Sequence, residues 1–95
     1  MEGYIVFNYR INDQEAYQPY LSQVMQTLIA HNAEILVADF ESETIEGDAG
    51  HVTVVLKFSS KDAARKWYQS PEYQNIIELR TDNCEGIAVL ADAAE

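Results

Sequence analysis

Two histidines give this sequence its most direct route to acid–base chemistry. Histidine is the side chain that most often moves protons near neutral pH, and the chain has two, His31 and His51. An enzyme built on either one needs further side chains to orient a substrate. Asn8, Arg10 and Trp67 are the residues that could hold an anionic or aromatic molecule by hydrogen bonds, charge and ring contacts. Together they define a catalytic hypothesis that involves no cofactor.

A second cluster lies in residues 67–80, which read WYQSPEYQNIIELR. Apolar and aromatic residues recur at three- and four-residue spacing on both sides of a Ser-Pro pair, which predicts a helix bent into two segments. The bend would bring Tyr68, Tyr73 and Arg80 to one corner, beside Glu72. We favour the simpler interpretation, in which the charges stabilise helix ends and the aromatic rings fill the core.

Motifs for metal or cofactor binding are missing from the sequence. His31 and His51 are separated by a predicted strand and turn, and neither has a close cysteine or histidine partner. No phosphate-binding loop or dinucleotide fingerprint occurs, so we expect neither a metal nor a cofactor. The lone Cys84 can form no internal disulfide, and its acidic neighbours disfavour a thiolate. A small, partly buried filler is the better interpretation of this residue.

Composition indicates a small, acidic, globular protein. Its 95 residues suit one domain spanning residues 1–95, and 47% of them are hydrophobic. A net charge of −10 disfavours binding to nucleic acid or to an anionic membrane. No apolar run reaches the roughly 20 residues that span a bilayer, and the N-terminus lacks a signal-peptide pattern. A single cysteine suits a reducing compartment, so we expect a cytoplasmic location.

The first half of the chain predicts a strand, a helix and a second strand. Tyr4–Ile11 is rich in aromatic and β-branched residues, and its odd-numbered positions form an apolar face. Proline inside a helix costs about 3 kcal/mol, so Pro19 disfavours an unbroken helix. We therefore expect a short turn over Asp13–Tyr17 and a main helix from Pro19, ended by His31-Asn32. The second strand covers Ala33–Phe40.

The second half predicts two more strands around the bent helix. Glu41–Glu46 either extends the second strand or forms a separate ribbon, and Gly47–Gly50 makes a turn. Val52–Phe58 is the strongest strand of the chain, Thr81–Gly86 is a loop, and Ile87–Ala91 is the last strand. The order β-α-β-β-α-β predicts an α+β, ferredoxin-like domain. Its four-stranded antiparallel sheet carries two helices on one face, with the first and third strands central.

One face of this sheet would have no helical cover. Its side chains are Tyr4, Val6, Thr53 and Val55 together with Asn8, Arg10 and Lys57. Exposed apolar area of this kind marks an interface or a ligand groove, so we expect two copies of the chain to pack face to face as a homodimer. The polar residues then either form the wet edge of the dimer seam, which we favour, or contact a ligand.

A longer pattern runs through residues 59–80: a Ser-capped helix with a double Ala, an aromatic pair, Ser-Pro-Glu-Tyr and a downstream Arg. Here these are Ser60, Ala63-Ala64, Trp67-Tyr68, Ser70-Pro71-Glu72-Tyr73 and Arg80. In this pattern the chain resembles the domain-of-unknown-function 1330 family. Further matches are Gly3-Tyr4, Tyr17, Tyr20, His31 and Glu46-Gly47-Asp48; departures are Asn32-Ala33 and Ala91-Asp92, where the family favours glycine. The resemblance implies a ferredoxin-like, dimeric α/β barrel and assigns neither an activity nor catalytic residues.

Two classes of function follow from these observations. In the first, the protein is a homodimeric module that holds a small molecule between sheet and helices. In the second, it is a cofactor-independent enzyme of the dimeric α/β-barrel type, similar to small monooxygenases or isomerases. We expect the ligand between the wall formed by the bent helix and the sheet face around Asn8 and Arg10. The candidate contacts are Asn8, Arg10, Lys57, Trp67, Tyr68, Tyr73 and Arg80.

Overall fold

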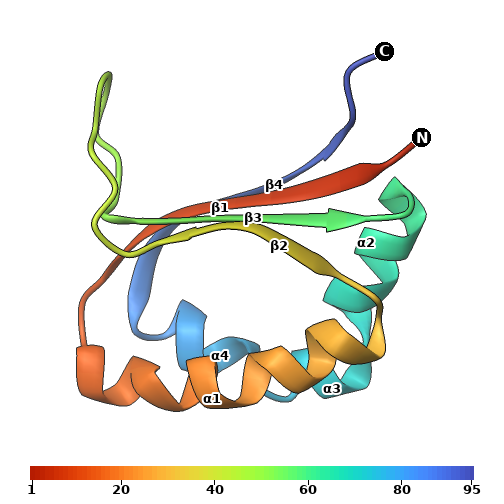
Figure 1. Ribbon diagram of the computed structural model, residues 1–95. Coiled ribbons are helices and arrows are strands. Elements are labelled where there is room, and N and C mark those ends of the chain that lie inside the picture. The colour runs from red at the N-terminus through yellow and green to blue at the C-terminus, as the bar shows by residue number, and fades with distance from the viewer.

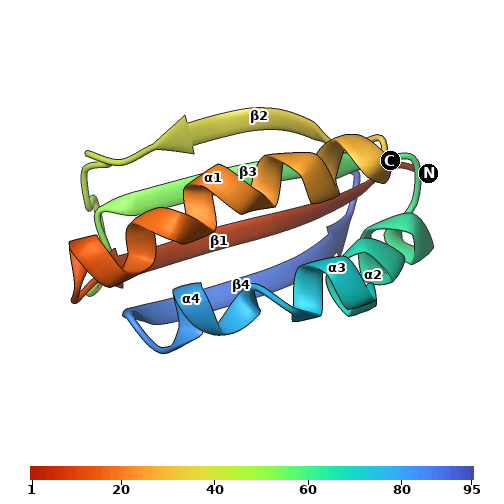
Figure 2. The same ribbon diagram turned by 90° about the horizontal axis from the view of Figure 1, so that it is seen from below.

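The chain folds into one antiparallel sheet with all its helices on one side. The computed structural model describes residues 1–95 (Figure 1). The elements are β1 Gly3–Ile11, α1 Gln14–Ala30, β2 Glu34–Asp39, β3 Val52–Phe58, α2 Lys61–Gln69, α3 Pro71–Gln74, α4 Ile77–Thr81 and β4 Cys84–Asp92. The strand order is β2-β3-β1-β4, and Figure 2 shows α1 beside the α2–α4 segment beneath the sheet. The predicted α+β, ferredoxin-like order is confirmed, with β1 and β3 central.

Strand β1 separates two different faces of the molecule. Its odd-numbered residues Ile5, Phe7 and Tyr9 are buried on the helix side, while the even-numbered residues between them are only half-buried. This alternation follows from the pleat of a strand, in which successive side chains point to opposite faces. The alternation predicted for this strand is confirmed.

Helix α1 is continuous through Pro19, so the predicted break is wrong. Asp13 caps the helix, accepting a hydrogen bond from the Ala16 backbone N–H at 3.1 Å. Proline removes the N–H that would bond to the carbonyl of Glu15, but both residues are exposed and water can serve that carbonyl. Burial of Tyr17 and Tyr20 on either side of the proline offsets the cost.

The C-terminal end of α1 follows the prediction. His31 is the cap residue, and Asn32 takes up a left-handed conformation with φ of 56°. Asparagine tolerates this conformation better than most side chains do. The turn it makes sends the chain directly into β2.

The bent helix has three segments where the sequence predicted two. Ser70 ends α2 and also caps α3, since its hydroxyl donates to the Trp67 carbonyl at 2.7 Å and accepts from the Tyr73 N–H at 3.3 Å. Pro71 follows at the first helical position, as predicted. A further break at Asn75-Ile76 separates α3 from α4, and no sequence signal marked it.

The segment between β2 and β3 is a loop. Glu41–Glu46 contains no strand, so neither predicted alternative for it is correct. Figure 1 shows this connection rising above the uncovered side of the sheet. The turn predicted at its end contains Gly47, whose positive φ of 80° suits glycine.

Strand β4 begins at Cys84, three residues before the predicted start. Cys84 pairs with Ile11 and Gly86 with Tyr9, so the predicted loop over Thr81–Gly86 is half strand. Glycine is needed at position 86, because an added Cβ would lie 2.2 Å from the Asn8 carbonyl oxygen. Close strand pairing therefore overrides the local preference for a loop.

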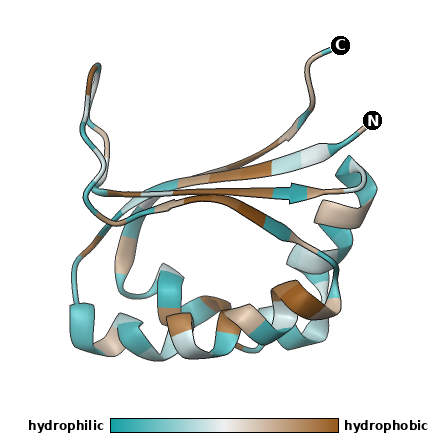
Figure 3. Cartoon of the chain, viewed as in Figure 1, coloured by the Kyte–Doolittle hydropathy of each residue, from teal (hydrophilic) through white to brown (hydrophobic).

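The core lies between the sheet and the helices and is largely aromatic. In Figure 3 the strands carry the longest hydrophobic stretches, whereas the helices are largely hydrophilic. Ring contacts link the layers, such as Phe7 edge-on to Trp67 at 6.4 Å and Trp67 against Tyr73 at 4.1 Å between centroids. The buried hydrophobic residues are Ile5, Phe7, Tyr9, Tyr17, Tyr20, Val24, Leu28, Val52, Leu56, Phe58, Ala64, Trp67, Tyr73 and Ile76.

Candidate functional site

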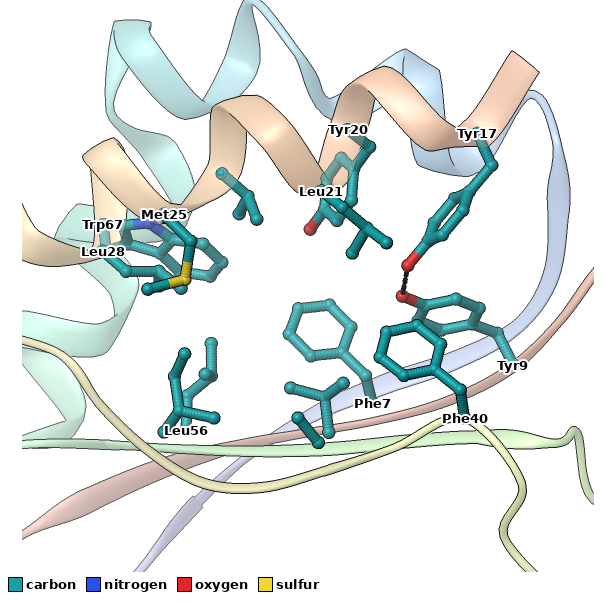
Figure 4. Close-up of a pocket in the computed structure, with 14 residues that line it drawn as sticks. Phe7, Tyr9, Tyr17, Tyr20, Leu21, Met25, Leu28, Phe40, Leu56 and Trp67 are labelled. Carbon is teal, nitrogen blue, oxygen red and sulfur yellow. Dashed lines mark hydrogen bonds between the residues drawn. The ribbon is translucent and has the colours of Figure 1, made fainter. Parts of the chain in front are cut away.

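A cavity of about 220 Å³ lies between α1 and the sheet (Figure 4). Every residue that lines it is hydrophobic or aromatic. The lining is Phe7, Tyr9, Tyr17, Tyr20, Leu21, Val24, Met25, Leu28, Ile35, Ala38, Phe40, Val54, Leu56 and Trp67. Pockets of this kind, apolar with a few placed polar groups, are the usual setting for small-molecule binding.

The cavity exists because the edge strand β2 is not covered by α1. All six residues of β2 are exposed, including Ile35 and Ala38, which line the cavity. A bulge between Ile35 and Val37 shifts the register of β2 against β3. Met25 on α1 and Phe40 after β2 are exposed lining residues, so they mark the mouth of the cavity.

Four buried tyrosines supply the polar atoms at the cavity wall and behind it. The hydroxyls of Tyr9 and Tyr17 lie 2.6 Å apart, and those of Tyr20 and Tyr73 lie 2.8 Å apart. Figure 4 shows the Tyr9–Tyr17 pair at one end of the cavity, with Trp67, Met25 and Leu28 at the other. Burial raises the pKa of all four phenols, so each is neutral at physiological pH.

Arg80 lies behind the cavity wall with only 8% of its surface exposed. Its guanidinium carbon is 4.9 Å from the Phe7 ring centroid, 5.8 Å from that of Tyr9 and 6.0 Å from that of Tyr20. These three rings also line the cavity, so the positive charge lies close behind it. Burial lowers the pKa of Arg80, but the phenols of Tyr73 and Tyr20 outweigh that effect and the net shift is upward. The guanidinium is therefore charged at every ordinary pH.

Trp67 forms the far wall of the cavity and is fully buried. Its indole N–H donates to the Thr27 hydroxyl at 2.9 Å, which fixes the ring against α1. Tyr73 and Tyr68 pack on Trp67 from outside the cavity, at 4.1 and 6.2 Å between centroids. Of the predicted contacts on the bent helix, only Trp67 reaches the cavity, while the others support the wall.

Asn8, Arg10 and Lys57 lie on the opposite side of the sheet from this cavity. The Nδ2 group of Asn8 donates to the carbonyls of Gly50 and Val52 at 3.1 and 3.2 Å, and its Oδ1 accepts from the Gly50 N–H at 2.8 Å. Asn8 therefore fastens the loop that precedes β3. The structure does not bring these strand residues together with Trp67 and Arg80, because β1 itself stands between the two groups.

The two cations on that face are paired with acids. Arg10 contacts Asp48 at 2.9 Å, and Lys57 contacts Glu2 at 2.9 Å and Glu34 at 3.5 Å. A shallow polar depression beside Asn8 and Arg10 is lined by residues of the same loop and of β4. The two walls between which the sequence predicted a ligand therefore lie on opposite sides of the sheet, each beside its own depression.

Neither histidine lies at the cavity. His31 is at the end of α1, where its Nε2 is 2.9 Å from Glu72 Oε1 and lowers the pKa of that carboxyl group through a hydrogen bond. His51 is exposed next to the start of β3. The Cys84 thiol has a raised pKa, but burial is the cause rather than the acidic neighbours. No group of three His, Cys, Asp or Glu side chains is placed to hold a metal ion.

Most of the cavity lining was interpreted from the sequence as ordinary core. Tyr17, Leu21, Val24 and Leu28 form the apolar stripe of α1, and Phe7 and Tyr9 lie on the apolar face of β1. Periodicity predicts that such residues point inward, but not whether the opposing layer reaches them. The available signal was the number of tyrosines on these faces, since each buried phenol needs a hydrogen-bond partner.

The sequence matches the model of one known protein family. The model of the family described as "Domain of unknown function (DUF1330)" matches residues 2–94. The chain belongs to this family. No relative among curated proteins matches it. No helix of the structure is long and apolar enough to cross a membrane.

Solved structures of other proteins share the fold of this DUF1330 chain. The cofactor-independent oxygenase SnoaB from Streptomyces nogalater superposes with a TM-score of 0.71 at 9% identity, covering 99% of this chain and 94% of its own. The methylated RPA0582 protein, of unknown function and from Rhodopseudomonas palustris, superposes with a TM-score of 0.81 at 11% identity, and the match covers 99% of this chain and 82% of its own. A dimeric, ferredoxin-like protein of unknown function from Bacteroides fragilis superposes with a TM-score of 0.60 at 12% identity, and the match covers 97% of this chain and 96% of its own. At these identities the likeness shows the shared fold alone.

Proposed function

We propose that this protein is a homodimeric binding module that holds a small, largely apolar molecule in the cavity between α1 and the sheet. The observation that carries the proposal is the cavity itself, about 220 Å³ in volume and lined by hydrophobic and aromatic side chains. A core without a ligand packs closely and leaves few voids larger than a water molecule. The single cysteine also supports a cytoplasmic location for the module.

Trp67 provides a direct measure of binding, because it is the sole tryptophan and lines the cavity. Small aromatic compounds are expected to change its fluorescence in a saturable manner and to raise the melting temperature. Leu21→Phe places a larger side chain in the cavity and should weaken binding at least about tenfold. Ile29→Phe is the matched control, since Ile29 lies on the same helix, is 70% exposed and does not line the cavity. Equal weakening in both variants, or no saturable response to any compound, would contradict the proposal.

The second copy is proposed to cover the bare face of the sheet. That face carries Val6 and Val55, which pair across β1 and β3, and the β4 residues Ile87 and Val89, which are 64% and 48% exposed in the single chain. Exposed apolar area of this extent favours an interface. The dimeric protein from Bacteroides fragilis, which has the same fold, supports a second copy as the occupant. The ion pairs of Arg10 and Lys57 then lie at the edge of the seam.

Sedimentation tests the dimer. Val55→Asp places a charge in the middle of the proposed seam and should give monomers or insoluble protein, while the wild-type chain sediments as a dimer at micromolar concentration. Ile29→Asp is the control, because Ile29 is 70% exposed on α1, on the opposite side of the sheet from the seam. A wild-type protein that is a folded monomer under these conditions would refute the dimer without touching the cavity proposal.

A cofactor-independent enzyme is the second candidate, favoured by the tyrosine hydroxyls at the cavity and by the likeness to SnoaB. With His31 and His51 away from the cavity, the phenols would have to act as the acid–base groups. Electron-rich naphthols are suitable test substrates, followed by oxygen uptake and by the mass of the products. Turnover that Tyr17→Phe slows at least about tenfold, with binding retained, would favour the enzyme over the module.

A further inference from the structure

Some hydrogen-bond donors in the interior next to the cavity have no acceptor. Each tyrosine pair contains two hydroxyl hydrogens, and the bond between the partners uses only one of them. No other side chain or backbone group accepts the second hydrogen of the Tyr9–Tyr17 pair or of the Tyr20–Tyr73 pair. One free donor therefore remains in each pair, in positions that are almost completely buried.

Arg80 adds a full positive charge to the buried region around the two tyrosine pairs. A guanidinium has five N–H donors and no acceptor, yet Arg80 forms no ion pair with any carboxylate of the chain. Its Nε is fully buried without a hydrogen-bond partner, the sole such atom in the protein. The faces of Phe7, Tyr9 and Tyr20 and the phenol of Tyr73 offset the charge, but none of these groups is an anion.

These groups face the same region from three directions. Tyr9 projects from β1, Tyr17 and Tyr20 from α1, and Arg80 from α4. Tyr20 links them, because its ring lines the cavity, its hydroxyl meets Tyr73, and its ring centroid is 6.0 Å from the Arg80 guanidinium. Buried donors and charges in native proteins nearly always have partners. The unused tyrosine hydrogens and the unpaired Arg80 charge are therefore a property of the ligand-free chain, and a ligand would supply their partners.

We propose that the ligand of the cavity is a small organic anion, with an apolar body and a carboxylate or phenolate group. The body occupies the space between Trp67 and Phe7, and the anionic oxygens accept from the free tyrosine hydroxyls. Arg80 acts as a positioning residue. Its positive charge lies behind the tyrosine rings and stabilises an anion bound at their hydroxyls. This inference rests on the proposed binding function and names the class of molecule bound.

Matched probes of one shape and two charges separate this inference from the binding proposal. 4-tert-Butylbenzoate and 4-tert-butylbenzamide differ in charge but little in size. Titration of the wild-type protein, followed by Trp67 fluorescence and calorimetry, should give about tenfold or greater preference for the carboxylate. The double variant Tyr9→Phe/Tyr17→Phe, which removes both hydroxyls of the pair, and Arg80→Met should each reduce that preference toward unity while the benzamide still binds. Arg65→Met is the control, because Arg65 is exposed and pairs with Asp62 on the same helix.

Each result decides a different point. A carboxylate preference that both variants abolish supports the inference. Equal binding of the two probes, or a preference for the benzamide, overturns the inference and leaves the binding module intact. A preference unchanged in Arg80→Met and in Tyr9→Phe/Tyr17→Phe also overturns it, since the charge would then be recognised elsewhere. Failure of both probes to bind overturns the binding proposal and the inference together.

Discussion

Replacing Arg80 with methionine is expected to make the ligand-free protein more stable. The guanidinium is buried without a carboxylate partner, and its Nε donates to nothing. Methionine has nearly the same length, so it keeps the methylene contacts of the arginine stem and removes only the charged group. Core substitutions usually destabilise, and a gain would therefore be informative.

The expected size follows from the contacts of Arg80. Desolvation of an ion costs several kcal/mol, and an orphan donor adds about 1–3 kcal/mol. Against this, a desolvated cation above an aromatic ring gains up to about 2 kcal/mol. The Phe7 ring is the nearest at 4.9 Å, those of Tyr9 and Tyr20 lie at 5.8 and 6.0 Å, and the Tyr73 phenol also favours the charge. A position in the last turn of α4 contributes about 0.3–1 kcal/mol more. A methionine sulfur among the same rings recovers about 0.3–1.5 kcal/mol. Taken at the low end of each cost, the balance is a gain of at least about 1 kcal/mol in the free energy of unfolding.

Urea unfolding followed by far-ultraviolet circular dichroism at one fixed protein concentration measures this difference. For a domain of this length the gain corresponds to a rise of roughly 4–8 °C in melting temperature per kcal/mol. Arg65→Met provides the control, with a change within about 0.5 kcal/mol, because its ion pair with Asp62 is exposed. A loss of more than about 1 kcal/mol in Arg80→Met would mean that the aromatic rings satisfy the charge on their own. Arg80 would then need no ligand to balance its charge.

Three further predictions concern the same strands and rings. Asn8→Ala should lower the free energy of unfolding by about 2 kcal/mol in urea, because it leaves the Gly50 N–H without its acceptor; Arg10→Ala should cost less than about 1 kcal/mol, since its partner is exposed. Gly50→Ala should yield little folded protein by circular dichroism, because the new Cβ would lie 2.1 Å from the Tyr9 carbonyl carbon. Raised phenol pKa values make the folded state lose stability as pH rises above about 10, where unfolded tyrosines ionise. Absorbance at 295 nm should therefore show four tyrosines that ionise only on unfolding: Tyr9, Tyr17, Tyr20 and Tyr73.

The fold could be predicted because each strand and cap carries a local signal. The alternation of β1, the strand Val52–Phe58 and the Ser70-Pro71 junction lie where the patterns place them. The errors occurred where a tertiary contact overrides a local preference. Burial of two tyrosines holds α1 through Pro19, and pairing with β1 extends β4 back to Cys84.

The cavity could not be predicted in the same way. A helical stripe such as Tyr17, Leu21 and Val24 looks identical whether the facing layer fills the space or leaves a gap. The gap depends on the bulge in β2 and on the distance of that strand from α1, which no single segment encodes. The predicted site joined Asn8 to Trp67, although the alternation of β1 already placed Asn8 on the other face. The hydrogen bonds of Asn8 to the loop before β3 arise from the β1–β3 register, in which Asn8 faces Thr53.

The polar interior is the part of the protein that a need for stability alone does not explain. A close-packed core of leucine or methionine at positions 17, 20 and 80 would bury the same space without free hydroxyls or an unpaired charge. Two measurements on Arg80→Met therefore have to agree. If the residue serves a bound anion, its replacement removes the preference for the carboxylate probe and stabilises the empty protein. If the arginine is only a structural cation held by aromatic rings, the same replacement destabilises the protein and leaves the preference of the cavity unchanged.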